Sequence, residues 1–443
     1  MENKQLLAFT RTFGCRGNVT DGEKINGMLA KMGYGFTRNQ DEADLILFNT
    51  CAVRENAETR VFGNVGSLIH HKRRNRDLIV VVCGCMVQKE DTAEKLRQTF
   101  PFVDLVFGTH VIHKFPEMLE RFKETRKRII DISENHEITE MFENMPVRRE
   151  SKLKADVPVM YGCDNYCSYC VVPYVRGRER SRNPDVILGE IRDLITDGVK
   201  EIMLLGQNVN SYSHGFPRLL HEIDTIPGEF RVFYMTSHPK DLSHELIDVI
   251  ADSKKISHHL HLPVQSGSNR ILQLMNRGYT VEQYLETIDY ARKRIPKISL
   301  TTDIIVGFPG ENRADFEKTL ELIRKARFDS AYTFIYSKRD GTKAANLPDP
   351  ISKEEKSTWF SEMLDVLDEV SGDAYSRYVG ETLRVLCEGE GRAGCAYSGR
   401  SREGIIVDFN CDNMNNIGEF VDIKIKEALK WAVKGTVTKH GSN

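Results

Sequence analysis

The chain has 443 residues, which favours two or three domains, and a formal net charge of −2. So balanced a charge argues against a protein whose whole surface binds polyanions. No apolar run approaches the roughly 20 residues that a membrane-spanning helix needs. The first ten residues lack the layout of a signal peptide, so we expect a cytoplasmic protein with no membrane partner. Disulfides are rare in the cytoplasm, so the ten cysteines are expected to be buried thiols or metal ligands.

Three stretches of the sequence are rich in basic residues, at 71–74, 121–128 and 176–182. Each by itself is more typical of a solvated surface than of a nucleic-acid site. Three such stretches in one chain keep RNA as a candidate partner.

The first 120 residues alternate short apolar runs with helix-like segments. The expected strands are 6–9, 45–48, 79–82 and 105–107, and the expected helices are 22–31, 55–70 and 90–99. Such alternation predicts an α/β domain with a parallel sheet of the Rossmann or flavodoxin-like kind. Residues 122–156 are charged and weakly periodic and contain Pro146, so we interpret them as a linker.

A second alternating region runs from about residue 157 to 337. Its expected strands are 157–160, 201–205, 232–235, 259–262, 299–306 and 331–336, and its expected helices are 184–197, 243–253, 281–294 and 312–326. Six strands predict a partial (β/α)6 barrel, because a full eight-stranded barrel needs about 250 residues. In such folds the active site lies on the loops that follow the C-terminal ends of the strands.

From Tyr378 the pattern changes to short strands, at 382–387, 404–409 and 420–425, separated by glycine-rich turns. This pattern predicts a small β-barrel, a fold that often binds RNA on one face. The expected domains are therefore 4–122, 149–375 and 376–439.

The sequence MYGCDNYCSYC follows the first expected barrel strand directly and places Cys163, Cys167 and Cys170 in the spacing C-x3-C-x2-C. A zinc site usually has four ligands in paired units, whereas this loop has three thiols and no fourth ligand nearby. Thiolates in a tight loop are typical of iron–sulfur ligation. Three ligands on a four-iron cluster would leave one iron open to a substrate or cofactor. Three buried thiols brought together by chance are the weaker alternative.

Three further cysteines, Cys15, Cys51 and Cys85, each follow an expected strand of the N-terminal region. Loops at the same ends of parallel strands converge in space, so these thiols could form one site that their sequence spacing hides. On the pattern alone, separate core cysteines remain the stronger alternative. Other cysteines lack ligand spacing and are interpreted as structural: Cys83, Cys387, Cys395 and Cys411.

The cysteine loop resembles the radical S-adenosylmethionine signature, and the whole chain resembles the methylthiotransferase family. The matching segments are TFGC at 12–15, NTCAVRENAE at 49–58, GCM at 84–86, YGCDNYCSYCVVPYVRGRERSR at 161–182, LLGQNVNSY at 204–212, HLPVQSGSNRILQLMNRGYT at 261–280 and TTDIIVGFPGE at 301–311. The resemblance implies a radical S-adenosylmethionine core and a C-terminal TRAM module. It also implies two 4Fe–4S clusters, one at the loop cysteines that cleaves S-adenosylmethionine and a second at Cys15, Cys51 and Cys85.

The RGRERSR form at 176–182 and the C-terminal IKIKEALKWAVKGTV are most similar to bacterial tRNA-modifying members of the family. Those members add a methylthio group at C2 of N6-isopentenyladenosine, at position 37 beside the anticodon. The resemblance implies as partners the tRNA anticodon stem-loop, a sulfur donor and a reductant such as flavodoxin or ferredoxin, and we expect a monomer. The tRNA members typically have Gln-Met-Asn after the first cysteine, whereas this chain has Arg16-Gly17-Asn18.

Two alternative functions remain open. The first is a methylthiotransferase that acts on threonylcarbamoyladenosine in tRNA or on a ribosomal protein. The second is a non-enzymatic iron–sulfur or zinc protein that binds RNA. In the favoured function, one S-adenosylmethionine supplies a methyl group to a sulfur at the second cluster and another yields the radical. The target base must leave the anticodon-loop stack, at a cost of a few kcal/mol.

Polar residues and glycines at the ends of the barrel strands are expected to contact S-adenosylmethionine. They are Gln207, Asn208, Ser237, His238, Gln265, Ser266, Thr302, Asp303, Gly307 and Gly310. Arg178 or Arg180 could pair with the methionine carboxylate, because arginine binds carboxylates bidentately. For each residue the alternative is an ordinary polar side chain on a barrel rim.

Four aromatic residues lie in or just before the last expected strand: Phe328, Tyr332, Phe334 and Tyr336. We interpret them as core residues rather than as a surface that stacks on bases. The helix expected at 357–370 carries Trp359, Phe360, Met363 and Leu367, which we interpret as packing.

Overall fold

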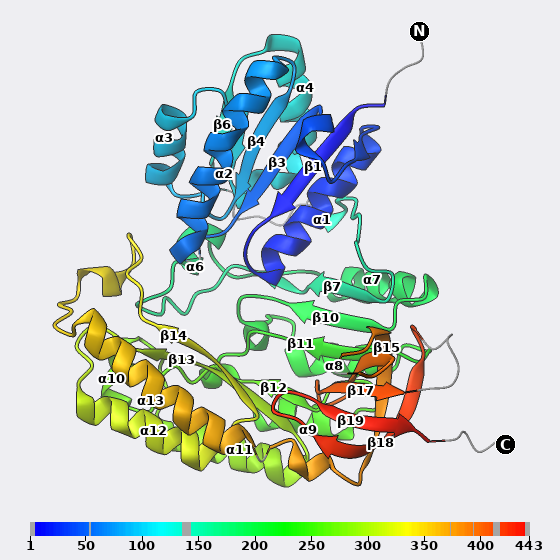
Figure 1. Cartoon of the computed structure of the whole chain (residues 1–443), viewed down its shortest axis with the longest axis vertical. Coiled ribbons are helices and arrows are strands. Elements are labelled where there is room, and N and C mark those ends of the chain that lie inside the picture. Colours follow the sequence, from blue (N-terminus) through cyan, green and yellow to red (C-terminus); the bar gives the residue numbers. More distant parts are fainter. Residues whose placement is uncertain are drawn as a thin grey trace.

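The computed structural model describes residues 5–52, 55–134, 143–372, 374–392, 394–410 and 417–438. An N-terminal domain lies at the top of Figure 1, a central core below it, and a small barrel, orange to red, beside the core. Cys411 lies outside the described residues. Within the described ranges, no helix is long and apolar enough to cross a membrane.

The N-terminal domain is a six-stranded parallel sheet in the order β2-β1-β3-β4-β5-β6. The strands are β1 Leu7–Thr12, β2 Gly35–Phe36, β3 Leu45–Thr50, β4 Ile79–Gly84, β5 Leu105–Phe107 and β6 Ile129–Asp131, and the helices are α1 Arg16–Lys31, α2 Glu55–Arg74, α3 Glu90–Thr99 and α4 Phe115–Thr125. Every residue of β3 and β4 is buried, as the continuous apolar runs predict, and a hydrophobic cluster covers each face of the sheet. The predicted parallel-sheet domain is confirmed.

Strand β6 corrects one prediction, because it lies inside the segment 122–156 that we interpreted as a linker. Three residues are too few to show a period in the sequence, and they become a strand by pairing with β5. Helix α1 also begins at Arg16, earlier than the predicted start at residue 22. The loop after Cys15 is therefore a helix N-terminus.

The core contains two three-stranded parallel sheets, in the orders β11-β10-β7 and β12-β13-β14. The strands are β7 Lys154–Pro158, β10 Glu201–Leu205, β11 Arg231–Tyr234, β12 His259–His261, β13 Ser299–Val306 and β14 Ser330–Ile335. The helices are α6 Val172–Arg176, α7 Pro184–Thr196, α8 Phe216–Asp224, α9 His244–Asp252, α10 Asn269–Leu274, α11 Val281–Arg294, α12 Arg313–Ala326 and α13 Lys353–Gly372. A parallel bridge joins Val232 of β11 to Ile256, three residues before β12, and so connects the two sheets through the chain. The predicted six-stranded partial barrel is confirmed.

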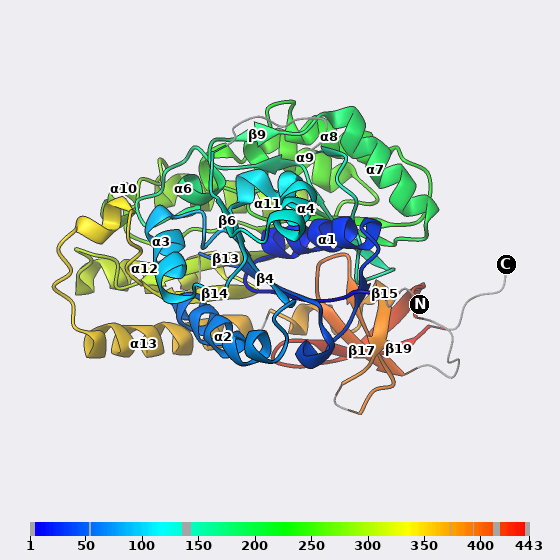
Figure 2. The same cartoon turned by 90° about the horizontal axis from the view of Figure 1, so that it is seen from above.

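One hydrophobic cluster joins the helix-facing sides of both core sheets. Seen from above, the helices run round the outside from α7 to α13, and the N-terminal domain lies over the middle (Figure 2). Alternate strand residues point the other way, to a surface that we call the inner face. Its members include Lys154, Asp156, Glu201, Arg231, Phe233, His259, His261, Asp303, Tyr332 and Phe334. The rings of Phe233 and His259 lie 6.3 Å apart, so the inner faces of the two sheets meet.

The aromatic residues around β14 correct a second prediction. Phe328 is buried, and Tyr336 packs its ring 5.5 Å from that of Phe308. Tyr332 and Phe334, however, are 56% and 51% exposed on the inner face. β14 is the last strand of its sheet, so side chains of a neighbouring strand flank the two rings on the β13 side alone. The expectation that both are core residues is wrong.

Short segments complete the core and its junctions. β8 Met160–Tyr161 pairs with β9 Arg180–Ser181, and short 3-10 helices lie at Gln40–Glu42, Thr109–Lys114, Val209–Ser211, Pro239–Asp241, Lys343–Asn346 and Ser376–Tyr378. The β8–β9 pair fixes both ends of the segment that carries the loop cysteines.

The C-terminal part is a closed barrel in the order β15-β16-β17-β19-β18. Its strands are β15 Thr382–Glu390, β16 Tyr397–Ser401, β17 Ile406–Asn410, β18 Phe420–Ala428 and β19 Val433–Val437. The small barrel is confirmed, with β16 and β19 in addition to the three expected strands. A parallel pair, β17 with β19, closes it around its own hydrophobic cluster.

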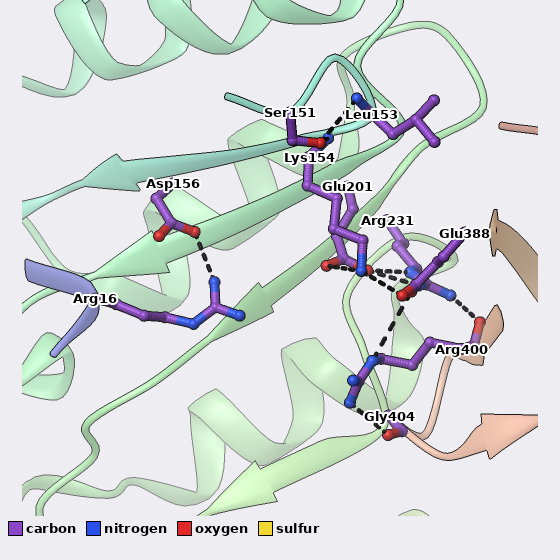
Figure 3. Close-up of polar contacts among 10 residues, drawn as sticks. All are labelled: Arg16, Ser151, Leu153, Lys154, Asp156, Glu201, Arg231, Glu388, Arg400 and Gly404. Carbon is purple, nitrogen blue, oxygen red and sulfur yellow. Dashed lines mark hydrogen bonds and ion pairs between the residues drawn. The ribbon is translucent and has the colours of Figure 1, made fainter. Parts of the chain in front are cut away.

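The C-terminal barrel docks where the strands of the core begin (Figure 3). Glu201 and Arg231 open β10 and β11, and they form a buried ion pair at 2.6 Å. Glu388 of β15 lies 2.6 Å from Lys154 and 3.1 Å from Arg231. A side chain at Gly404, between β16 and β17, would touch the rings of His259 and Phe233 at about 3.4 and 3.5 Å. The barrel therefore covers the inner face at the end where the core strands begin.

Replacing Glu388 by Gln should loosen this docking by about 1.5 kcal/mol, because the carboxylate shared by two cations is lost at a partly exposed site. Hydrogen exchange in β15 to β19 of the full chain measures the change. Glu229→Gln is the control, since its pair with Arg384 is more exposed and should contribute little. Equal loss of protection in both variants would contradict the prediction.

Candidate active site

The loop that carries Cys163, Cys167 and Cys170 runs from β8 to α6 and is tied to the next strand of the core. The backbone N–H of Gly162 donates to Oε1 of Gln207 at 2.6 Å, just after β10. The N–H of Cys163 donates to the carbonyl of Gly177 at 3.2 Å. These bonds place the three thiols at the C-terminal ends of the strands, where barrel active sites lie.

The loop thiols form one electrostatic group. Burial, together with the charge of Cys167, raises the pKa of Cys163 to about 11 and that of Cys170 to about 12. Arg277 donates from its guanidinium to Sγ of Cys167 at 3.3 Å and to the carbonyl of Pro263 at 2.7 Å. Three grouped thiols with a cation beside them are a donor set that suits an iron–sulfur cluster. Sequence reasoning missed Arg277, although it lies in the matching segment 261–280.

Cys15, Cys51 and Cys85, far apart in the sequence, are brought together at the ends of neighbouring strands. A hydrogen bond with Cys51, helped by a nearby arginine, lowers the pKa of Cys15 to about 5. Gly14, at φ +109°, lies so close to Cys51 that a side chain there would collide with it. The thiol of Cys85 donates to Oδ1 of Asn18 at 3.2 Å, in the first turn of α1. The three loops thus form one thiol group, of the kind that can hold a second cluster.

Arg176, the last residue of α6, connects the two thiol groups. Its Nε donates to Sγ of Cys85 at 3.0 Å, and another of its nitrogens pairs with Asp21 at 2.7 Å. A further bond of 2.7 Å reaches Asn18. Since α6 begins two residues after Cys170, a single short helix joins both groups. Arg176 lies in the basic stretch 176–182, but the sequence predicts Arg178 or Arg180 as the functional arginine.

The two arginines predicted to pair with the methionine carboxylate, Arg178 and Arg180, do not join the thiol groups. Arg178 is 66% exposed at its side chain and pairs with Asp164 at 2.7 Å. Arg180 donates to the backbone carbonyl of Arg176 at 3.1 Å. A methionine carboxylate bound by Arg178 would have to displace Asp164.

Arg16 and Gly17, which differ from the residues typical of the tRNA members, lie between the N-terminal domain and the core. Arg16 pairs with Asp156 on β7 at 2.7 Å (Figure 3). A side chain at position 17 would contact Sγ of Cys15 at 3.7 Å, the guanidinium of Arg176 at 3.8 Å and the amide of Gln207 at 3.9 Å. Position 17 therefore borders both the second thiol group and the end of β10.

Polar atoms without partners gather at the ends of the strands. Among the buried side-chain atoms of the described residues that have no hydrogen-bond partner are four at expected contact residues: Oδ1 of Asn208, Oγ of Ser237, Nε2 of His238 and Oε1 of Gln265. Buried polar atoms are normally paired, so these are available to a polar ligand such as S-adenosylmethionine. Thr236 and Gln265 also have positive φ, 73° and 72°, a strain that is frequent at functional sites.

Other expected contacts are already used within the protein. The hydroxyl of Thr302 donates to the carbonyl of Leu262 and accepts from the N–H of Val264, both at 2.9 Å, so it ties β13 to the end of β12. Ser266 Oγ accepts from the N–H of Ser268 at 3.2 Å. Gly307, at φ +73°, donates its N–H to Glu311 at 2.6 Å. For Thr302 and Ser266 this supports the alternative of satisfied rim residues.

Asp303 lies on the inner face, 3.5 Å from Nε2 of His261. Burial raises the pKa of Asp303 to about 7, against the attraction of Arg277. Ionisation therefore costs more in the folded than in the unfolded chain, whose carboxyl has its ordinary pKa near 3.8. This contribution lowers stability as the pH rises from about 4 to about 7.

Asp303→Asn should therefore stabilise the chain relative to the wild type at pH 8, with little difference near pH 4. Urea unfolding at several pH values tests this. Asp77→Asn is the control, because its side chain is largely exposed. A stability difference for Asp303→Asn that does not change with pH would contradict the raised pKa.

In the part of the chain that the structure describes, no three His, Cys, Asp or Glu side chains are close enough to hold a single metal ion. In a four-iron cluster each thiolate binds a different iron, so its ligands lie further apart than those of one ion. Both thiol groups suit a cluster by their chemistry.

Comparison with protein families gives three matches along the chain. Residues 157–323 match the radical SAM superfamily, residues 8–108 match Uncharacterized protein family UPF0004, and residues 376–438 match the TRAM domain. The three matches follow the order of the N-terminal sheet, the partial barrel and the closed barrel.

Curated relatives match nearly the full chain. A tRNA-2-methylthio-N(6)-dimethylallyladenosine synthase of Caldicellulosiruptor saccharolyticus is 48% identical over 96% of this chain and 91% of its own length. The enzymes of the same name from Thermoanaerobacter pseudethanolicus and Clostridium tetani are each 46% identical, over 99% and 98% of this chain and 94% and 97% of their own.

Solved structures with a similar fold are more distant in sequence. The radical S-adenosylmethionine methyltransferase TsrM from Kitasatospora setae has a TM-score of 0.58 at 14% identity, covering 77% of this chain and 74% of its own. The cobalamin-dependent S-adenosylmethionine radical enzyme OxsB has a TM-score of 0.52 at 13% identity, covering 83% and 56%. At these identities the likeness concerns the fold alone.

Proposed function

The chain belongs to the family of tRNA-2-methylthio-N(6)-dimethylallyladenosine synthases, and from that premise we propose that it catalyses the methylthiolation its relatives are named for. The substrate would be N6-isopentenyladenosine at position 37 of tRNA, and the product its 2-methylthio derivative. The observation that carries the proposal is the pair of thiol groups, joined through α6 by Arg176. A radical chemistry and a sulfur chemistry at one site are what this conversion needs.

In this proposal Cys163, Cys167 and Cys170 hold one 4Fe–4S cluster and Cys15, Cys51 and Cys85 a second. The chemistry supplied by such a cluster with S-adenosylmethionine is the generation of a carbon radical, which suits a C2 position that offers polar reagents little to attack. The chain itself must bind, orient and exclude water. The unpartnered atoms of Asn208, Ser237 and Gln265 would orient S-adenosylmethionine at the strand ends.

The partners follow from the same chemistry. The closed C-terminal barrel would bind the tRNA stem-loop, since small barrels of this kind commonly bind RNA. A low-potential reductant, such as flavodoxin or ferredoxin, and a sulfur donor would also be required. The protein would act in the cytoplasm, where tRNA is found.

The decisive experiment is a nucleoside analysis of tRNA from a strain that lacks this gene and from the same strain complemented with it. We expect 2-methylthio-N6-isopentenyladenosine to disappear in the first strain and return in the second. An unchanged level of that nucleoside would refute the substrate. A change in the threonylcarbamoyl derivative instead would identify the related tRNA activity.

A further inference from the structure

Two large aromatic side chains, Tyr332 and Phe334, are exposed on the inner face of β14, although both lie in the middle of a core strand. Their neighbours in the sheet are Asp303 and Ile305, which pair with them in register. Soluble proteins seldom leave adjacent large apolar side chains uncovered, and such pairs commonly mark a binding surface. We call Tyr332 and Phe334 the β14 platform.

The β14 platform adjoins the candidate active site. The ring of Tyr332 meets that of His261 edge-on at 5.9 Å, and His261 also contacts the carboxylate of Asp303. Gln265, with its unpartnered amide oxygen, bridges to Ile304 on the same strand as Asp303. A ligand that stacks on Tyr332 would therefore lie on the surface that continues to the strand ends, where the target adenosine would react.

Other parts of the chain already contact the remaining sides of the inner face. Where the core strands begin, Gly404 of the C-terminal barrel lies against His259 and Phe233. On the β7 side, Arg16 of the N-terminal domain pairs with Asp156 (Figure 3). The edge strand β14 carries the exposed rings. A large substrate would therefore reach the inner face across β14.

We propose that the β14 platform stacks on unpaired nucleobases of the RNA that flank the target adenosine. This inference rests on the proposed function, which supplies an anticodon loop as the substrate. Every base has a π-face, so two aromatic rings bind a single-stranded loop with little sequence preference. The rings hold the neighbouring bases while the target base leaves the stack, and the stacking offsets part of the cost of extruding it. Exposed Lys338, just beyond β14, adds a positive charge for the RNA backbone.

The test uses the anaerobically reconstituted full chain and an anticodon stem-loop RNA that contains N6-isopentenyladenosine. The loop base 3′ of the target is replaced by fluorescent 2-aminopurine, whose emission is quenched by stacking. Tyr332→Ala and Phe334→Ala should each weaken RNA binding about tenfold and restore the emission of the bound RNA. Tyr332→Phe and Phe334→Tyr keep a ring and should retain both affinity and quenching. Iron content and melting temperature monitor folding.

Ile335→Ala is the matched control, because it removes a large, partly exposed side chain from the opposite face of the same strand. It should bind RNA as the wild type does. Wild-type affinity and quenching in both alanine variants would overturn the inference, and so would an equal loss in Ile335→Ala. A loss confined to RNA that carries the isopentenyl group would also overturn it, since the rings would then contact that group. Absence of methylthiolated product when the wild-type chain also receives S-adenosylmethionine, a low-potential reductant and a sulfur donor would instead refute the proposed function.

Discussion

Replacing Cys163, Cys167 and Cys170 together by alanine is expected to abolish formation of 5′-deoxyadenosine from S-adenosylmethionine. The variant should still bind about four irons, because the second thiol group is made by other strands and does not depend on the loop. Iron analysis after anaerobic reconstitution, with product analysis by mass spectrometry, measures both quantities. The effect is all-or-none, since no other described thiol lies in the loop.

The reciprocal variant separates the two thiol groups. With Cys15, Cys51 and Cys85 replaced by alanine, the chain should still form 5′-deoxyadenosine but no methylthiolated RNA. Cys395→Ala is the control and should keep both iron sites, because Cys395 lies in the C-terminal barrel region away from both groups. A loop variant that binds only zinc or no iron would refute the second cluster.

Arg176→Leu is expected to destabilise the contact between the N-terminal domain and the core by about 3–5 kcal/mol. Its guanidinium forms a buried ion pair with Asp21, and removing one partner leaves the other charge buried and unpaired. Two further hydrogen bonds, to Cys85 and Asn18, are lost with it. Hydrogen exchange in α1 and β4 of the full chain measures the loss.

Two further variants test whether the loss in Arg176→Leu comes from the buried ion pair with Asp21. Arg176→Leu combined with Asp21→Asn should recover part of the stability, because the unpaired carboxylate is gone. Arg178→Leu, in the same basic stretch, should cost at most about 1 kcal/mol, since its pair with Asp164 is largely exposed. Similar losses for Arg176→Leu and Arg178→Leu would argue against a special role for Arg176.

Arg16 and Gly17 stand where the tRNA members of the family typically have Gln and Met, and the structure shows what these two residues contact. The sequence marks Arg16 and Gly17 as unusual next to Cys15 but says nothing of their neighbours. The structure pairs Arg16 with Asp156, a residue 140 positions away, and leaves position 17 facing both Arg176 and Gln207. The charge at position 16 therefore contributes to the contact between two domains.

Local patterns in the sequence were sufficient for most of the longer strands and helices. The strands at 201–205 and 299–306 and the helices at 90–99 and 281–294 begin and end where their patterns predict, because the period of buried side chains is a local property. The loop at Cys163 is equally local, since its three thiols lie within eight residues. The strand β6 was not predicted, because its three residues show no period and only their pairing with β5 makes them a strand.

The sequence by itself determined the order of the domains, the cysteine loop and the approximate positions of the main strands. Only the tertiary structure decided which partners the distant arginines have: Arg176 contacts Cys85, and Arg16 pairs with Asp156. It also decided that Tyr332 and Phe334 are exposed, which their apolar character does not predict. Hydrophobicity states that a side chain favours burial, but burial on a sheet face requires a second layer of side chains packed on that face. At the edge strand β14 the rings of Tyr332 and Phe334 are flanked by strand neighbours on the β13 side alone and stay half exposed.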